Sequence, residues 1–284
     1  MLIVAGTVPI KELPLVASSP NFRIPCTMGT AAMVSTAVVT CEYLGIDRPF
    51  WITAGDIGEG NGSRVIYRYL IERVPEISPT VLSMHYLLPI MTAMRKVIES
   101  VEKCDKKPAL IADAGSMYAA KAAGLAQKFD IFTPDAGELA FLADPDATHP
   151  AYIRQYLFGI DDKEAKKLIE QAYESGNAAR VLLVKNPIDY IAEDGRVMTT
   201  ISEPNIPELE AIGGTGDTIT GLISALVSAG YTPREAAIVA AKANRMVGKF
   251  SDINTATKIA QLIPRFPDVF RRYLREWSKA RHSK

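Results

Sequence analysis

The sequence predicts an α/β fold in which a mostly parallel central sheet is covered by helices on both faces. Strand-like and helix-like segments alternate between residues 49 and 185, as expected for parallel strands joined by helical crossovers. The strand-like segments are almost continuously apolar, which is typical of strands buried on both faces. The last third of the chain has the apolar spacing of helices. No linker or repeat interrupts the chain, so we expect one domain over residues 1–284.

Strands are predicted where apolar, aromatic and β-branched residues run together. They cover residues 49–54, 80–88, 109–114, 130–134 and 180–185. Residues 190–200 predict a hairpin whose turn is "EDGR", residues 193–196. Helices are predicted where apolar residues recur at every third or fourth position. They cover residues 63–74, 89–103, 116–129, 162–176, 215–229, 233–248, 255–262 and 266–280.

Three of these helices have a recognisable start. Pro89 suits a first helical position, where no backbone N–H is needed. Ser116 is expected to cap the helix that follows it. Thr232 and Glu235 have the spacing of a capping box around Pro233.

Composition and charge exclude several classes of function. The chain is 48% apolar and 23% charged, with a formal net charge of zero, so neither nucleic acid nor an anionic membrane is an expected partner. Cys26, Cys41 and Cys104 lie far apart and the chain has three histidines, which predicts a reducing compartment and no zinc site. The N-terminal segment lacks a signal-peptide pattern and no apolar run is long enough to span a membrane. We therefore expect a cytoplasmic protein.

The segment "EAIGGTGDTITGLISALVSAG", residues 210–230, concentrates glycines ahead of an apolar helix. It lacks the lysine of a Walker A loop and the spacing of the dinucleotide fingerprint. Gly213, Gly214, Thr215 and Gly216 form the turn into the helix. The first amides of a helix lack internal partners and lie at the positive end of the dipole, so they bind anions.

Asp217 follows this turn directly. A carboxylate at this position can take a proton from a hydroxyl while the amides hold the charge that develops. The alternative is an aspartate that only stabilises the helix start.

The same segment resembles the G-[AT]-G-D motif of the ribokinase-like superfamily, whose fold is a three-layer α/β/α sandwich. The doubled glycine and "GDTITG" are most similar to the ADP- or ATP-dependent NAD(P)H-hydrate dehydratases. By this resemblance, Gly214, Thr215 and Gly216 form an anion hole and Asp217 is the catalytic base. The resemblance implies ADP or ATP and Mg²⁺ as cofactors.

Other segments follow the order of the same family. "TPDAGE", residues 133–138, resembles the segment whose glutamate helps to organise magnesium through water, a role that falls on Glu138. Asp135 and Glu138 also have the spacing of a capping box, and both interpretations stay open. The family often has histidine or asparagine at the position of Asp135.

Two strand ends supply the remaining residues of this set. "LIADA" resembles the strand that ends in a substrate-binding aspartate, here Asp113, and ligands of parallel sheets collect at such strand ends. "VLLVK" resembles the strand whose lysine approaches the nucleotide, here Lys185, although Asn186 replaces the glycine that usually follows.

The first part of the chain departs further from the family. Residues 28–45 are similar in placement to its glycine-led helix, and the resemblance is loose over residues 1–104 and good over 105–250. The loop "TAGDIGEGNGSR" (53–64) has no counterpart. Its amides could hold a polar substrate, with Gly58 and Asn61 as the candidate residues; a plain surface loop is the alternative.

Three hypotheses about function follow. The first is ADP- or ATP-dependent dehydration of NAD(P)H hydrate. The second is a kinase for a small alcohol, such as a sugar or a vitamin precursor like hydroxyethylthiazole, which needs the same hydroxyl, base and nucleotide phosphate. The third is a non-catalytic nucleotide-binding protein, which would not need Asp217. The expected partner is a small molecule, and a homo-oligomer is compatible with the sequence.

Overall fold

The computed structural model describes residues 1–18, 24, 28–147 and 160–278. Cys26 and residues 279 and 280 of the predicted last helix lie outside these ranges. The described strands form one nine-stranded sheet in the order β2-β3-β1-β4-β5-β6-β7-β8-β9. Their bounds are Leu2–Val8 (β1), Val16–Ala17 (β2), Phe50–Gly55 (β3), Val81–His85 (β4), Ala109–Asp113 (β5), Ile131–Phe132 (β6), Val181–Val184 (β7), Asp189–Glu193 (β8) and Arg196–Ile201 (β9).

The centre of the sheet is parallel and its edges are antiparallel. β3, β1, β4, β5, β6 and β7 run in one direction. β2 pairs antiparallel with β3, and the hairpin β8–β9 extends the other edge. The carboxyl ends of the parallel strands therefore meet at one edge of the sheet, where ligands of such folds bind.

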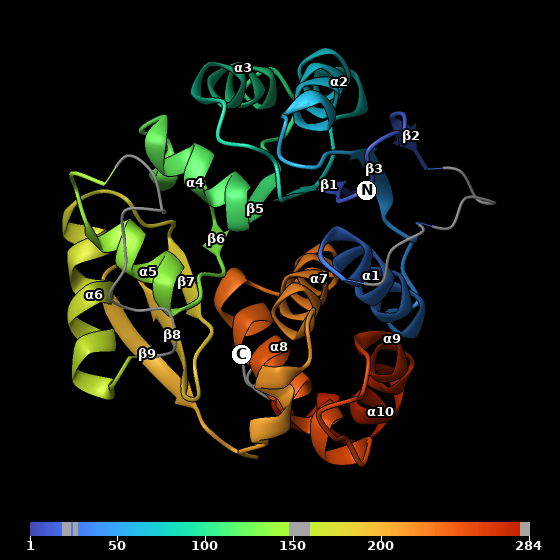
Figure 1. Ribbon diagram of the computed structural model, residues 1–284, viewed down its shortest axis with the longest axis vertical. Coiled ribbons are helices and arrows are strands. Elements are labelled where there is room, and N and C mark those ends of the chain that lie inside the picture. Colours follow the sequence, from blue (N-terminus) through green and yellow to red (C-terminus); the bar gives the residue numbers. More distant parts are fainter. Residues whose placement is uncertain (19–23, 25–27, 148–159, 279–284) are drawn as a thin grey trace.

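Helices cover both faces of the sheet. α2, α3, α4, α5 and α6 lie along one face and α1, α7, α8 and α10 along the other (Figure 1), and each layer has its own hydrophobic core. The helices are α1 (Thr30–Leu44), α2 (Asn61–Ile77), α3 (Met91–Val101), α4 (Ala114–Ala122), α5 (Ala136–Ala143), α6 (Asp162–Glu174), α7 (Thr215–Ser228), α8 (Pro233–Phe250), α9 (Ile259–Leu262) and α10 (Phe266–Trp277), with the 3-10 turns η1 (Ala126–Lys128), η3 (Pro207–Ala211) and η4 (Ile263–Arg265). These are the three layers of the ribokinase-like sandwich that the sequence predicted.

The sequence analysis missed one central strand. β1 has all seven residues buried and pairs with β3 on one side and β4 on the other. Its sequence is a short, almost continuously apolar run, which is typical of a strand buried on both faces. The short edge strand β2 was also not predicted.

Three local predictions are wrong in detail. Ser116 does not cap α4: the Asp113 side chain accepts from the Ala114 N–H, while the Ser116 hydroxyl accepts from Leu87 N–H. Pro89 precedes α3, which begins at Met91.

The predicted helix 255–262 is also shorter than expected. Residues 254–257 form a turn, because the Asn254 side chain accepts from the Ala256 N–H, and α9 begins only at Ile259. By contrast, the capping box of Thr232 and Glu235 is confirmed.

Helices α1 and α7 pack closely, and this contact places the start of α7 over the sheet edge. A Cβ at Gly221 of α7 would lie 2.4 Å from the carbonyl oxygen of Met33 in α1. A glycine is therefore required at position 221 for the two backbones to approach. Within the described part of the chain, no helix has the length and apolar character to cross a bilayer.

Candidate active site

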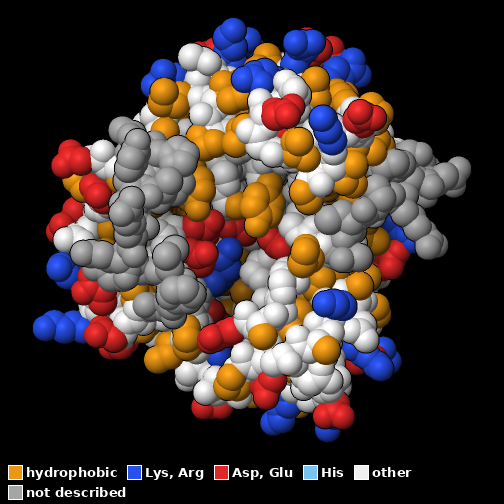
Figure 2. Space-filling model, viewed as in Figure 1, with side chains coloured by type: hydrophobic (Ala, Val, Ile, Leu, Met, Phe, Trp, Pro, Cys, Tyr) orange, Lys and Arg blue, Asp and Glu red, His pale blue; other side chains and the backbone are white. Residues whose placement is uncertain are grey.

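A cavity of about 530 Å³ opens at the carboxyl ends of the parallel strands. Figure 2 shows acidic and basic side chains gathered in a hollow at the middle of this face. Its lining comes from the ends of β4, β5 and β7 and from the starts of α5 and α7, with α8 on one side. The lining includes Tyr86, Asp113, Asp135, Glu138, Lys185, Gly214, Thr215, Gly216, Asp217, Asn244 and Arg245.

The first turn of α7 presents backbone amides to this cavity. Gly214 is the N-cap, with a φ of 104° in the left-handed region that favours glycine, and no side chain caps the helix. The Thr215 hydroxyl donates to the carbonyls of Leu209 and Ile212, so it is turned back into the protein. As amides of the first helical turn, those of Gly216 and Asp217 lack intrahelical acceptors, and amides placed in this way can bind an anion.

Asp217 is the acidic residue in the first turn of α7. Its Oδ2 accepts from the Gly29 N–H at 2.8 Å, and its Oδ1 lies 3.1 Å from Nε2 of His85. Burial alone would raise the pKa of Asp217. The His85 and Lys185 side chains and the Gly29 amide outweigh burial and lower it. The carboxylate is therefore ionised at neutral pH and able to accept a proton.

The buried Asp113 and the partly buried Lys185 form an ion pair at the ends of β5 and β7. Nζ of Lys185 lies 3.0 Å and 3.2 Å from the two Asp113 oxygens, and the Thr220 hydroxyl donates to Oδ2 at 2.7 Å. Burial would lower the pKa of Lys185, but the carboxylates of Asp113 and Glu138 raise it above its usual value. Lys185 therefore carries a fixed positive charge at the cavity wall.

Glu138 has the capping role that the sequence left open, and its side chain also lies at the cavity. It forms a capping box with Asp135 at the start of α5, which confirms that prediction. Its carboxylate also lines the cavity, accepts from the Tyr118 hydroxyl at 3.1 Å and lies 3.9 Å from Nζ of Lys185. Burial raises the pKa of Glu138 to about 8. A carboxyl group placed in this way can accept hydrogen bonds from ligands while it holds the helix start.

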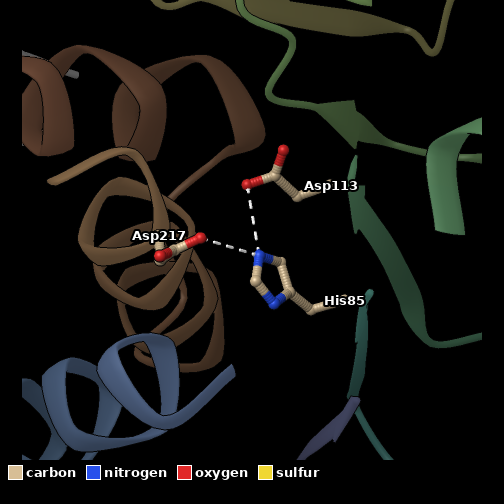
Figure 3. Close-up of side chains that lie close together, drawn as sticks. All are labelled: His85, Asp113 and Asp217. Atoms are coloured by element: carbon tan, nitrogen blue, oxygen red, sulfur yellow. Dashed lines mark ion pairs between the residues drawn. The ribbon is translucent and has the colours of Figure 1, made fainter. Parts of the chain in front are cut away.

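His85 was not predicted from the sequence. It is the last residue of β4, it is fully buried, and Nε2 faces both Asp217 and Asp113 at 3.1 Å and 3.7 Å (Figure 3). It lies in the predicted strand 80–88 and belongs to no familiar motif. One feature of the sequence could have indicated it: a histidine near the end of a predicted buried strand. The carboxyl ends of parallel strands form the edge of the sheet where ligands bind.

The far end of the cavity contains a second buried ion pair that the sequence analysis missed. The Arg245 Nε donates to Asp189 Oδ2 at 2.8 Å, and Arg245 also donates to the carbonyls of Asn186 and Pro187. Burial raises the pKa of Asp189 to about 6, against the opposing effect of Arg245. Asn186, which stands where a glycine was expected, is part of this polar wall.

Three predicted residues do not line the cavity. Gly213 packs against Met28, whose Sδ would lie 2.8 Å from a Cβ at that position. Gly58 lies in the turn before α2, where the Asp56 carboxylate accepts from the amides of Gly58 and Gly60, and Asn61 is the first residue of α2. The substrate-binding role of Gly58 and Asn61 stays a prediction, as do the assigned roles of the other site residues.

The family is shown by comparison with known proteins. The sequence profile of the NAD(P)H-hydrate dehydratase family matches residues 88–265. The uncharacterized protein MJ1337 of Methanocaldococcus jannaschii is 40% identical over 243 residues, which cover 86% of this chain and all of that protein. An ADP-dependent (S)-NAD(P)H-hydrate dehydratase of Nitrosopumilus maritimus is 30% identical over 145 residues, which are 51% of this chain and 45% of that protein.

A solved structure shares the fold at lower identity. The ADP/ATP-dependent NAD(P)H-hydrate dehydratase of Bacillus subtilis, co-crystallised with ATP and Mg²⁺, superposes with a TM-score of 0.56 at 18% identity, over 85% of this chain and 84% of that one. The architecture is thus ribokinase-like. With its profile match over more than half of the chain, this protein belongs to the NAD(P)H-hydrate dehydratase family of enzymes.

Proposed function

We propose that this protein removes water from hydrated NADH or NADPH at the expense of ADP or ATP. The observation that carries the proposal is the position of Asp217 in the cavity, beside the open amides at the start of α7. A base and an anion site are the two elements that transfer of a phosphoryl group to a hydroxyl requires. Family membership and the names of the relatives support the hydrated nicotinamide ring as the acceptor.

The side chains suit a two-step reaction. Asp217 takes the proton of the hydrate's hydroxyl while that oxygen attacks the terminal phosphorus of the nucleotide, and the bond from phosphorus to the bridging oxygen breaks. The amides of residues 214–217 stabilise the negative charge that shifts onto the transferred group. Phosphate then leaves the ring carbon, assisted by the electron pair of the ring nitrogen. Loss of a proton from the neighbouring carbon restores the double bond.

Lys185 and Glu138 suit the nucleotide side of the site. The fixed charge of Lys185 favours a phosphate in the cavity. The oxygen donors Glu138 and Asp135 both line the cavity, and they fit Mg²⁺, which binds oxygen ligands and keeps several waters. Bound Mg²⁺ would neutralise phosphate charge. Glu138 is held by its cap and by Tyr118, so we propose that it contacts the ion through water.

A kinase for a small alcohol would use the same groups, so the substrate must be tested directly. The protein should restore the near-ultraviolet absorbance of NADH from its hydrate when ADP or ATP and Mg²⁺ are present, with release of one phosphate per ring. The Asp217→Asn variant is the control, because repair that depends on the protein's own proposed base should be lost in it. Phosphorylation of a sugar or of hydroxyethylthiazole, without any repair of the hydrate, would favour the kinase. Nucleotide binding with neither reaction would support the non-catalytic hypothesis.

A further inference from the structure

His85 has an environment that neither the family assignment nor the motifs explain. Its ring is fully buried at the end of β4, and Nδ1 lies 3.0 Å from the Thr30 hydroxyl oxygen. Nε2 lies 3.1 Å from Asp217 Oδ1 and 3.7 Å from Asp113 Oδ2. Neither contact has the alignment of a hydrogen bond, so among the described residues this buried nitrogen has close carboxylate neighbours but no hydrogen-bond partner. Figure 3 shows this nitrogen between the two carboxylates.

These contacts favour a hydrogen on Nε2. An unprotonated nitrogen would place its lone pair beside carboxylate oxygens, which also carry lone pairs and negative charge. A buried contact of that kind is strongly unfavourable, whereas an N–H donor there makes a charge-assisted contact. The Thr30 hydroxyl can either donate to Nδ1 or accept from it, so it permits a proton on Nε2 in the neutral ring and in the charged ring.

A metal ion bound by the same three side chains would be the other way to neutralise this cluster. His85, Asp113 and Asp217 bring one nitrogen and two carboxylate oxygens within 4.8 Å of one another. Both oxygens of Asp113, however, already lie within 3.2 Å of Nζ of Lys185. Because the ammonium group supplies the positive charge at Asp113, an N–H on Nε2 is the remaining favourable contact for Asp217, and the cluster does not require a metal ion.

We propose that His85 is a positioning residue that fixes the carboxylate of Asp217 through the hydrogen on Nε2; this rests on the proposed role of Asp217 as the base. The Gly29 N–H donates to Oδ2 of Asp217, and Nε2 of His85 lies 3.1 Å from Oδ1. The hydrogen bond at one oxygen and the contact with His85 at the other both restrict rotation of the carboxylate. Each of its oxygens keeps a further lone pair, so the group can still take the substrate proton.

The backbone around His85 is built to hold the ring in this place. Gly6 of β1 is paired with His85 of β4. A Cβ at Gly6 would lie 2.4 Å from the His85 carbonyl oxygen and 2.6 Å from the Thr30 hydroxyl oxygen. A side chain at position 6 would therefore displace Thr30 and the ring that it contacts.

The protonation state can be measured without any enzyme assay. The chain has three histidines, so labelling them with ¹⁵N and comparing the spectrum with that of His85→Gln assigns the ring nitrogens of His85. We expect the Nε2 signal of a protonated nitrogen near neutral pH, and we expect it to shift in Asp217→Asn. An unprotonated Nε2, including one bound to a metal ion that EDTA removes, would overturn the proposal, whether or not the protein repairs hydrates.

Two substitutions then separate positioning from packing. His85→Gln keeps an amide donor at the level of Nε2, and His85→Leu keeps the volume without a donor. If the protein repairs hydrates, kcat should fall about a hundredfold in His85→Leu and about tenfold or less in His85→Gln. A loss of this size is expected when a reacting group, here the Asp217 carboxylate, is misplaced. The affinity for ADP should stay within about twofold in both variants, because the amides of α7 are unchanged. Equal losses in both variants would overturn the proposal.

The pH dependence gives a readout that packing alone would not move. The titratable groups that face His85 or its partners are Asp113, Asp217, Lys185, Glu138 and Tyr86. His85 helps to lower the pKa of Asp217, so its loss should raise that pKa. The acid limb of kcat/KM should therefore move to higher pH in His85→Leu, and move less in His85→Gln. An unmoved acid limb in His85→Leu, in a variant that melts like the wild type, would contradict the proposal.

Discussion

Replacement of Asp217 by asparagine tests the proposed base, and the structure sets its cost in stability. The asparagine oxygen can still accept from the Gly29 N–H, which now lies 2.8 Å from Asp217 Oδ2. Its NH₂ group then faces Nε2 of His85, where the carboxylate oxygen lies at 3.1 Å. Two donors would oppose each other there. An asparagine that keeps a cap would by itself cost at most about 1 kcal/mol; loss of the charge-assisted contact with the Nε2 hydrogen raises the expected loss to about 1.5–3 kcal/mol.

The effect on rate should be far larger than the effect on binding. Asparagine cannot take the proton of the hydroxyl, so kcat should fall on the order of a hundredfold to ten-thousandfold. The amides of residues 214–216 are unchanged, and a negative charge beside the phosphate is removed. We therefore expect the dissociation constant for ADP to stay the same or to decrease.

Three measurements on the same preparation decide the outcome. They are repair of hydrated NADH, ADP binding by calorimetry and urea unfolding. Thr232→Ala is the matched control, because loss of its cap should cost about 1 kcal/mol far from the cavity and leave kcat unchanged. Near-normal turnover in Asp217→Asn would refute its role as the base. Failure of the variant to fold would show that Asp217 is chiefly a structural residue of the helix start.

Three further predictions concern stability. Gly221→Ala should lower the free energy of unfolding by about 1–3 kcal/mol, because its Cβ would lie 2.4 Å from the Met33 carbonyl oxygen; an unchanged urea midpoint would contradict this. The raised pKa of Glu138, about 8 against the usual 4.5, favours its protonated form in the fold. The stability that the wild-type fold gains from protonated Glu138 is fully present below the unfolded pKa and is lost as pH rises through the folded pKa. Because glutamine stays neutral, Glu138→Gln should gain stability relative to wild type as pH rises between these two values, and thermal melts would measure this. Lys185→Met should cost about 3–5 kcal/mol by leaving Asp113 unpaired in the interior, and a double variant with Asp113→Asn should recover part of it.

Most of the proposed site could be predicted because its residues follow local patterns. Asp113 ends the apolar strand β5 and Lys185 directly follows the apolar strand β7. Glu138 and Asp217 lie in the first turns of helices. Such positions can be identified from a single segment of sequence. The rule that parallel strand ends share one edge then predicts that they lie together, and Asp113 and Asp217 do line the same cavity.

The far wall of the cavity could not be predicted in this way. Arg245 lies in the middle of α8, and its partner Asp189 begins β8. Arg245 lies at neither end of its helix, and Asp189 precedes the hairpin predicted over residues 190–200, so no local pattern marked either residue. Their pairing at 2.8 Å depends on how α8 crosses the sheet, which is a matter of tertiary packing that helical periodicity does not specify.

His85 could not be placed without β1, because β1 determines where the order of the strands reverses. From β1 the chain passes through α1 to β3 on one side and returns through α2 to β4 on the other. In open α/β sheets the crevice beyond such a reversal is where ligands bind. His85 ends β4 at this crevice, and Gly29, which binds Asp217, immediately precedes α1 there. The omission of a seven-residue strand thus concealed the contact between His85 and Asp217, although both side chains lay in elements that were predicted.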